Sequence, residues 1–446
     1  MIEPTEFFSR RQQLLSAMQA NSICLVPAAG LVTRSRDTEY SFRQDSYFQY
    51  MCGFPEPEAW LLLSNSERYP NGLSVLFCLD KNPNTEIWQG RRFGPKMAKK
   101  TFQLDMTFPL EELDEKLLEL VDGHEFLYFA QGHMAEADAQ VFALLDALRA
   151  APKQSKQAPH NMVDLRPIVD EMRLFKSAAE VQVMREAARI STTAHKRAMQ
   201  AAQAGRYEYY LEAEIHHQFA IDGARYPAYG TIVGSGDNGC ILHYTENSDE
   251  LHDGDLVLID AGCELQGYAA DITRTFPVSG RFSAEQKQVY QTVLDAQLAA
   301  FEMIKPGNTM KDSADRAIEI ITQGLIELGI LQGDLAENIK QQGYREFYMH
   351  GLSHWLGMDV HDVGNYKIDG QDRPFEPGMV LTVEPGIYIA PDAKVDKRWQ
   401  GIGIRIEDNL LITESGYENL TQGVPKTIQE IEGFMSGQSL SSMAGA

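Results

Sequence analysis

The sequence predicts an α+β protein built from two folded domains. Three observations predict this class. The chain has 446 residues, which exceeds the size of one ordinary domain. Strand-like and helical patterns alternate up to about residue 150, as they do in an α/β domain. After residue 231, strand-like segments dominate and the helical patterns are grouped between them, which is typical of an α+β domain.

The first domain is predicted to cover residues 1–172. An apolar run at 74–80 has the length and composition of a buried strand, and the run at 139–150 has helical spacing. The stretch 151–161 is polar and contains proline and lysine. It is therefore the best linker candidate, with the domain boundary near residue 170.

The second domain is predicted to cover residues 173–436, and the small, polar segment 437–446 is expected to form a disordered tail. Ser177 and Glu180 have the spacing of a capping box at the start of a long helix that ends near Gln203. Further along, strand-like segments cover 256–262, 267–276, 379–388 and 401–413, and helical stretches cover 284–304 and 309–329.

The composition narrows the class of function. Hydrophobic residues make up 43% and charged residues 23% of the chain, as in ordinary globular proteins. The 40 Lys and Arg residues against 63 Asp and Glu give a net charge of −23, which repels nucleic acids and anionic membrane surfaces. The polar first residues and the lack of a long apolar run predict a cytoplasmic protein without a membrane segment. Five widely spaced cysteines are expected to remain reduced thiols.

The sharpest chemical signal is a pair of aspartates in two apolar strands that a short loop joins. A tight turn centred between Leu265 and Gln266 would place Asp260 directly opposite Asp271, with their Cβ atoms about 5 Å apart. Two like charges in that arrangement destabilise a sheet, and burial disfavours each ionised carboxylate. Divalent cations would relieve both costs, whereas a lone aspartate in a strand more simply faces solvent or caps a turn.

Two glutamates repeat this pattern. Glu384 lies within LTVEPG and Glu407 within GIRIEDN, in runs where strand propensity and burial both disfavour glutamate. Arg405 precedes Glu407 by two residues, so alternation would put both side chains on one face of a strand. A salt bridge to Arg405 is one account of Glu407, and metal ligation is the other.

Three histidines, His350, His354 and His361, lie within the glycine-containing segment 349–362. Glycine permits close backbone approach, so this segment is expected to be a loop folded over a site. One imidazole could be a metal ligand while the others act as proton donors. His243, in GCILHYTEN, is a weaker fourth candidate.

Four carboxylates and one histidine form a mostly oxygen ligand set, which suits manganese or another hard divalent ion better than a thiolate-type zinc site. Four negative charges also balance two divalent ions. A dinuclear centre lowers the pKa of a shared water to give a hydroxide nucleophile, and it stabilises the oxyanion formed when hydroxide attacks a carbonyl. The residues therefore predict a hydrolase with two divalent ions per subunit, most simply Mn²⁺.

Five short motifs resemble those of the pita-bread metallopeptidases, in the family's order of Asp, Asp, His, Glu and Glu. They are LIDAG with Asp260, DITRTF with Asp271, HGLSHWLG with His354, TVEPG with Glu384 and GIRIED with Glu407. Two longer segments, TRSRDTEYSFRQDSYFQYMCGFPEPEA and GARYPAYGTIVGSGDNGCILHYTEN, resemble the bacterial aminopeptidase P group of that family. The resemblance runs from about residue 5 to residue 435.

The resemblance implies a ligand assignment. Asp271 and Glu407 would bridge two metals. Asp260 would complete the coordination sphere of one metal, and His354 with Glu384 would complete that of the other.

The resemblance also implies roles in catalysis. Glu384 would relay a proton from the bridging water to the leaving nitrogen. His243 and His361 would contact the substrate and the tetrahedral intermediate, and Arg405 would orient the site. His350 lies nearby with a less certain role.

A substrate and an assembly follow from the same resemblance. Aminopeptidase P enzymes cleave before a proline in the second position of a peptide, a residue whose nitrogen carries no hydrogen. The resemblance further implies a creatinase-like α/β N-terminal domain ahead of a pita-bread catalytic domain. It implies association into homodimers or homotetramers, with Trp88 contributing to a neighbouring site.

Several alternatives remain open at this point. A prolidase restricted to Xaa-Pro dipeptides, or a relative that also hydrolyses organophosphates, would carry the same metal site. A methionyl aminopeptidase shares the ligands but often lacks a large N-terminal domain. A non-catalytic binding module of this fold would have lost ligands, and all five are present in this chain.

Overall fold

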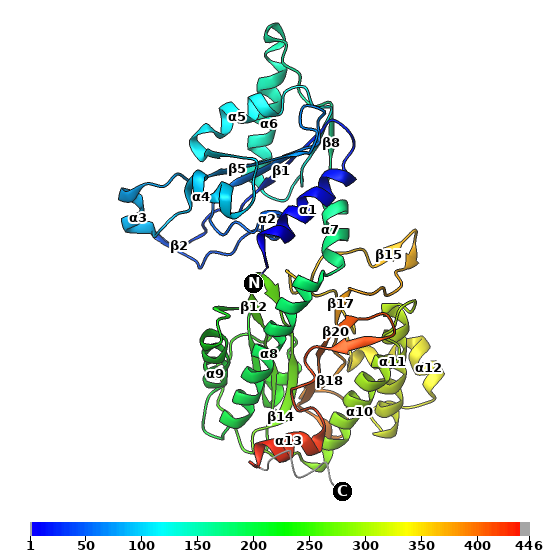
Figure 1. The fold of residues 1–446 in the computed structure, drawn as a ribbon. Coiled ribbons are helices and arrows are strands. Elements are labelled where there is room, and N and C mark those ends of the chain that lie inside the picture. Colours follow the sequence, from blue (N-terminus) through cyan, green and yellow to red (C-terminus); the bar gives the residue numbers. More distant parts are fainter. Residues whose placement is uncertain (1, 438–446) are drawn as a thin grey trace. The chain divides into compact units, whose positions relative to one another are not determined.

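The computed structural model describes residues 2–437, and the chain divides into two compact units, one ending at Arg173 and the next beginning at Leu174 (Figure 1). Of the tail expected at 437–446, all but Gly437 lies outside the described residues. None of the helices within the described range combines the length and the apolar character that a bilayer-spanning segment needs.

A six-stranded mixed sheet forms the centre of the N-terminal unit, in the order β6-β5-β4-β1-β7-β8. The strands of this unit are β1 (Ser22–Pro27), β2 (Thr33–Ser35), β3 (Thr38–Glu39), β4 (Trp60–Ser64), β5 (Leu73–Cys78), β6 (Met106–Pro109), β7 (Phe126–Tyr128) and β8 (Asn161–Val163). Its helices are α1 (Pro4–Ala17), α2 (Ser46–Cys52), α3 (Pro83–Gln89), α4 (Gly94–Thr101), α5 (Leu113–Leu120) and α6 (Ala135–Arg149), and α7 (Arg166–Leu174) leads out of the unit.

The strand predicted at 74–80 and the helix predicted at 139–150 are confirmed as β5 and α6. The linker predicted at 151–161 is wrong. This segment leads from α6 to β8, which pairs in parallel with β7 at the edge of the same sheet. Its polar composition is that of a surface loop within the unit.

The helices of the C-terminal unit pack with its strands around one hydrophobic core that includes the fully buried Ile259, Phe276 and Leu381. The helices are α8 (Ala178–Ala201), α9 (Glu208–Ile221), α10 (Ala284–Phe301), α11 (Met310–Glu327), α12 (Leu335–Gln341) and α13 (Ile428–Met435). The capping box is confirmed, because the Ser177 hydroxyl accepts from the Glu180 N–H and the Glu180 carboxylate accepts from the Ser177 N–H. The two helical stretches predicted near 284–304 and 309–329 are confirmed as α10 and α11.

The strands of this unit form small antiparallel sheets, among them β10-β11-β14, β13-β12-β9, β17-β20-β21 and β18-β19. They are β9 (Tyr226–Pro227), β10 (Ile232–Ser235), β11 (Leu256–Asp260), β12 (Cys263–Leu265), β13 (Tyr268–Ala269), β14 (Thr273–Pro277), β15 (Lys367–Ile368), β16 (Gln371–Asp372), β17 (Val380–Val383), β18 (Gly386–Ile389), β19 (Ile402–Arg405), β20 (Asp408–Ile412) and β21 (Tyr417–Asn419). Antiparallel hairpins with separate helices confirm the predicted α+β class.

The register predicted for the two aspartates is wrong by two residues. Asp260 lies opposite Thr273, and Leu265 lies opposite Tyr268. The turn therefore consists of Gln266 and Gly267, whose φ angles of 53° and 86° are both positive, as the favoured two-residue hairpin turns require. Since a shift of two preserves the face of each side chain, Asp260 and Asp271 still project from the same side of the hairpin.

Candidate active site

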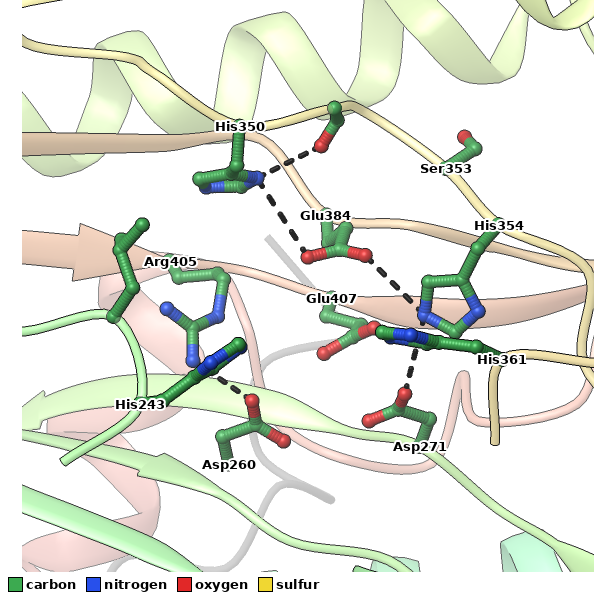
Figure 2. A pocket seen from close by; sticks show the side chains of 12 residues that line it. His243, Asp260, Asp271, His350, Ser353, His354, His361, Glu384, Arg405 and Glu407 are labelled. Carbon is green, nitrogen blue, oxygen red and sulfur yellow. Dashed lines mark hydrogen bonds and ion pairs between the residues drawn. The ribbon is translucent and has the colours of Figure 1, made fainter. Parts of the chain in front are cut away.

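One cavity of about 320 Å³ in the C-terminal unit collects nine of the ten residues that the sequence singles out (Figure 2). These nine are His243, Asp260, Asp271, His350, His354, His361, Glu384, Arg405 and Glu407. The tenth, Trp88, lies instead on α3 in the N-terminal unit, where its side chain is 86% exposed.

The four carboxylates of the cavity lie where strands end. Asp260 is the last residue of β11, and Asp271 lies between β13 and β14. Glu384 separates β17 from β18, and Glu407 separates β19 from β20. Because regular pairing stops at these positions, the side chains turn toward a common space (Figure 2).

A close approach of the backbone makes the break at Asp271 possible. A Cβ atom added to Gly262 would lie 1.7 Å from the carbonyl oxygen of Ala270, so the hairpin accepts only glycine at this position. The pairing continues on both sides of the break, since Ala261 N–H donates to Ile272 O and Ala270 N–H donates to Cys263 O.

His354 lies on the predicted loop and points into the acidic cluster. Its Nε2 atom is 3.4 Å from Asp271 Oδ2 and 3.4 Å from Glu384 Oε1 (Figure 2). The other ring nitrogen, Nδ1, lies 2.9 Å from Trp355 O. A backbone carbonyl that accepts from Nδ1 leaves Nε2 free to bind a metal, which is the usual arrangement of a histidine ligand.

Burial and crowding shift the pKa values of three carboxyl groups in the cluster. Burial raises the pKa of Glu384 to about 8, against the opposing effect of His354. Burial and then Asp271 raise the pKa of Glu407 well above its usual value, and burial and then Asp260 raise that of Asp271. Burial and mutual repulsion therefore disfavour the ionised forms of these three carboxylates.

The donor set fits a metal centre. Asp271, His354 and Glu407 each offer one atom such that all three atoms lie within 4.8 Å of one another. Asp260 and Glu384 line the same cavity and bring the set to four carboxylates and one imidazole. Divalent cations would supply the charge that the crowded acids lack, and oxygen-rich ligands are those that hard cations prefer.

Arg405 forms its salt bridge with Asp260 and not with Glu407, the partner considered from the sequence. Arg405 donates through Nη2 to Asp260 Oδ2 at 2.8 Å and through Nε to Thr273 Oγ1 at 3.2 Å. The Thr273 hydroxyl in turn donates to Glu407 Oε2 at 2.7 Å. Strand β19 ends at Arg405, so the alternation of faces does not extend to Glu407.

The remaining histidines differ in exposure. His350 is half-buried with Nε2 2.8 Å from Tyr388 Oη, and burial lowers its pKa to about 4. His361 is exposed, and its ring centroid lies 4.2 Å from that of His354. His243 is exposed on the loop after η3 (Gly236–Cys240). His243 and His361 are thus the accessible imidazoles of the cavity lining.

The sequence did not reveal two residues that touch the aspartates. The Tyr229 hydroxyl lies 2.6 Å from Asp260 Oδ1 and 2.5 Å from Asp271 Oδ1. The Asn409 side chain accepts from the Asp271 N–H at 3.0 Å and donates to the Asp271 carbonyl. Tyr229 lies within one of the segments that carry the family resemblance, but neither residue stands out by charge or spacing.

Comparison with protein-family models assigns both units. Residues 182–414 match the model described as metallopeptidase family M24. Residues 7–128 match the model described as the aminopeptidase P N-terminal domain.

Curated relatives match along nearly the full length. Xaa-Pro aminopeptidase of Escherichia coli is 52% identical over 436 residues, which cover 97% of this chain and 98% of the relative. Xaa-Pro aminopeptidase of Haemophilus influenzae is 46% identical and covers 97% of each chain.

Solved structures of aminopeptidase P enzymes have the same fold as this chain. A single-residue variant of Escherichia coli aminopeptidase P, in complex with substrate, superposes with a TM-score of 0.96 at 51% identity, and the match covers 98% of this chain and 99% of that chain. Aminopeptidase PepP of Pseudomonas aeruginosa has a TM-score of 0.96 at 48% identity, with 98% of each chain covered.

Proposed function

The chain belongs to metallopeptidase family M24, and we propose on that premise that it removes the N-terminal residue of peptides whose second residue is proline. The observation that carries the proposal is the convergence of four carboxylates and His354 in one cavity. The relatives that match both units are named Xaa-Pro aminopeptidases, which supports the proline-specific reaction over other hydrolyses.

The chain offers ligands for two divalent cations, which we take to be Mn²⁺. Asp271 and Glu407 would be shared by both ions. Asp260 would complete the ligands of one, and His354 with Glu384 those of the other. When bound, the ions supply an acidified water as nucleophile and Lewis-acid stabilisation of the oxyanion.

Residues of the chain itself would move protons and orient groups. Glu384 lines the cavity beside His354 and would carry a proton to the proline nitrogen that leaves. The exposed His243 and His361 would donate hydrogen bonds to the substrate and the tetrahedral intermediate. Arg405 orients Asp260 through their 2.8 Å hydrogen bond. His350 lies beside Glu384, with its Nδ1 atom 3.8 Å from Glu384 Oε2.

Assembly, domain roles and location complete the proposal. Residues 1–172 would form the creatinase-like domain and 173–436 the pita-bread catalytic domain. Exposure of Trp88 supports its use at a neighbouring subunit in a homodimer or homotetramer. The five free cysteines, four of them buried, are compatible with a reducing cytoplasm.

The function is tested with peptides of matched sequence. Enzyme freed of metal and reloaded with Mn²⁺ is expected to cleave Xaa-Pro-Yaa peptides at least as efficiently as Xaa-Pro dipeptides, and far more efficiently than Xaa-Ala-Yaa. Longer peptides can contribute binding energy to the transition state. Enzyme left without metal is the control and should be inactive. A strong preference for the dipeptide would make the protein a prolidase, and full activity after verified metal loss would refute a metallopeptidase.

His361→Ala is expected to keep both Mn²⁺ ions while kcat/KM falls roughly 10²-fold or more, because a donor to the intermediate is lost. Metal content and steady-state rates measured on the same sample check this. The matched control is His217→Ala, which removes an exposed imidazole on α9 and should leave both quantities unchanged. Loss of metal from His361→Ala would show that the imidazole is a ligand instead.

A further inference from the structure

The Tyr229 hydroxyl is placed between two carboxylates that belong to the proposed metal centre. It lies 2.6 Å from Asp260 Oδ1 and 2.5 Å from Asp271 Oδ1, both short enough for charge-assisted hydrogen bonds. A phenol has one hydrogen, so the two carboxylates share one donor. Tyr229 therefore couples the positions of the two aspartates to each other.

The other partners of these aspartates act on one aspartate each. Arg405 Nη2 donates to Asp260 Oδ2 at 2.8 Å. Asn409 holds the backbone N–H of Asp271 at 3.0 Å and also donates to its carbonyl. Arg405 and Asn409 thus each orient one aspartate. Tyr229 contacts both carboxylates and can therefore affect the distance between them.

The backbone that carries Tyr229 is anchored to the hairpin that carries both aspartates. Strand β9, which ends two residues before Tyr229, pairs with β12, with Pro227 opposite Cys263. Ala228 N–H then donates to Gly262 O at 2.9 Å. Because Gly262 lies between Asp260 and Asp271 in the chain, the phenol, Asp260 and Asp271 are held by one set of strand pairings.

We propose that Tyr229 is a positioning residue that holds the carboxylates of Asp260 and Asp271 at the separation that two divalent cations require. The inference rests on the proposed metallopeptidase function. Without the hydroxyl, the two carboxylates repel each other with no shared donor between them, so binding of the ions has to restore an arrangement that Tyr229 maintains in advance. Outer-shell partners of metal ligands typically contribute 10- to 100-fold to metal affinity.

The test is calorimetric titration of the metal-free full-length protein with Mn²⁺. Tyr229→Phe removes one oxygen and keeps the ring. We expect its Mn²⁺ affinity to fall about 10- to 100-fold relative to wild type, with two ions still bound at saturation. Near-ultraviolet circular dichroism and the melting temperature of each metal-free sample show that the fold is retained.

Tyr268→Phe is the matched control. The Tyr268 hydroxyl is buried and donates to a carboxylate, Glu180 Oε1, at 2.8 Å, but Glu180 is outside the proposed ligand set. Its Mn²⁺ affinity should equal that of wild type. An unchanged affinity in Tyr229→Phe, or an equal loss in Tyr268→Phe, would overturn the inference. Wild type that binds no Mn²⁺ would instead refute the proposed metal centre, so the two failures are distinguishable.

Discussion

Asp271→Asn is expected to lose both bound metal and nearly all activity, with kcat/KM falling roughly 10³-fold or more. Asp271 lies within reach of His354, shares the Tyr229 hydroxyl with Asp260, and is proposed to serve both ions. An amide has nearly the same shape but carries no charge. The variant therefore removes charge from both ion sites at once and forfeits several kcal/mol of transition-state stabilisation.

Metal content by mass spectrometry and turnover of an Xaa-Pro-Yaa peptide test this expectation together. Asp253→Asn is the matched control, because Asp253 is an exposed acid in the turn before β11. It should bind two ions and retain the wild-type rate. If Asp271→Asn kept two ions and a rate near that of wild type, the shared-ligand role of Asp271 would be wrong.

Asp408→Asn is expected to lower the free energy of unfolding by about 3–5 kcal/mol. Asp408 is fully buried and accepts from Arg274 Nη2 at 2.7 Å, from Lys426 Nζ at 2.8 Å and from Thr421 Oγ1 at 2.7 Å. Burial alone would raise its pKa, but Arg274 and Lys426 hold that pKa at about 2. The amide would leave the buried Arg274 without its counterion, which is far costlier than losing an exposed pair.

Denaturant unfolding followed by tryptophan fluorescence measures this effect, since Trp355 and Trp399 are both buried in the C-terminal unit. The matched control is Asp315→Asn, which removes the acid of the exposed Lys311–Asp315 pair and should cost less than about 1 kcal/mol. A loss in Asp408→Asn no larger than that of the control would show that the buried network does not stabilise the unit. Glu407 and Asn409 flank Asp408, so this network lies directly beside the site in the chain.

The residues that line the cavity could be predicted because their chemistry conflicts with their local pattern. A carboxylate within an apolar run of residues, as at Asp260 or Glu384, can be recognised from the sequence alone and requires a compensating charge. The long helices were predictable for a similar reason, since a capping box such as that of Ser177 and Glu180 depends on residues three positions apart. These signals are local, so no knowledge of distant contacts is needed to read them.

The register of the hairpin that carries Asp260 and Asp271 could not be predicted from the local sequence. Both a turn at Leu265 and Gln266 and a turn at Gln266 and Gly267 bring the strands together. The choice depends on backbone angles, and Gly267 readily adopts the positive φ of 86° that the second turn needs. The predicted pairing of Asp260 with Asp271 is wrong, because Asp260 lies opposite Thr273, but a two-residue slip keeps each side chain on its face, so both aspartates still project from one side.

The sequence by itself determined the α+β class, the four acids and the histidines of the site. The tertiary structure decided how they are held, because that depends on contacts between residues far apart in the chain. Arg405 binds Asp260, 145 positions away, instead of Glu407 two positions away, and Asn409 reaches the backbone of Asp271 across 138 positions. The packing of whole strands decides which strand ends converge and which neutral side chains, such as Tyr229, lie between them. No local sequence pattern predicts either.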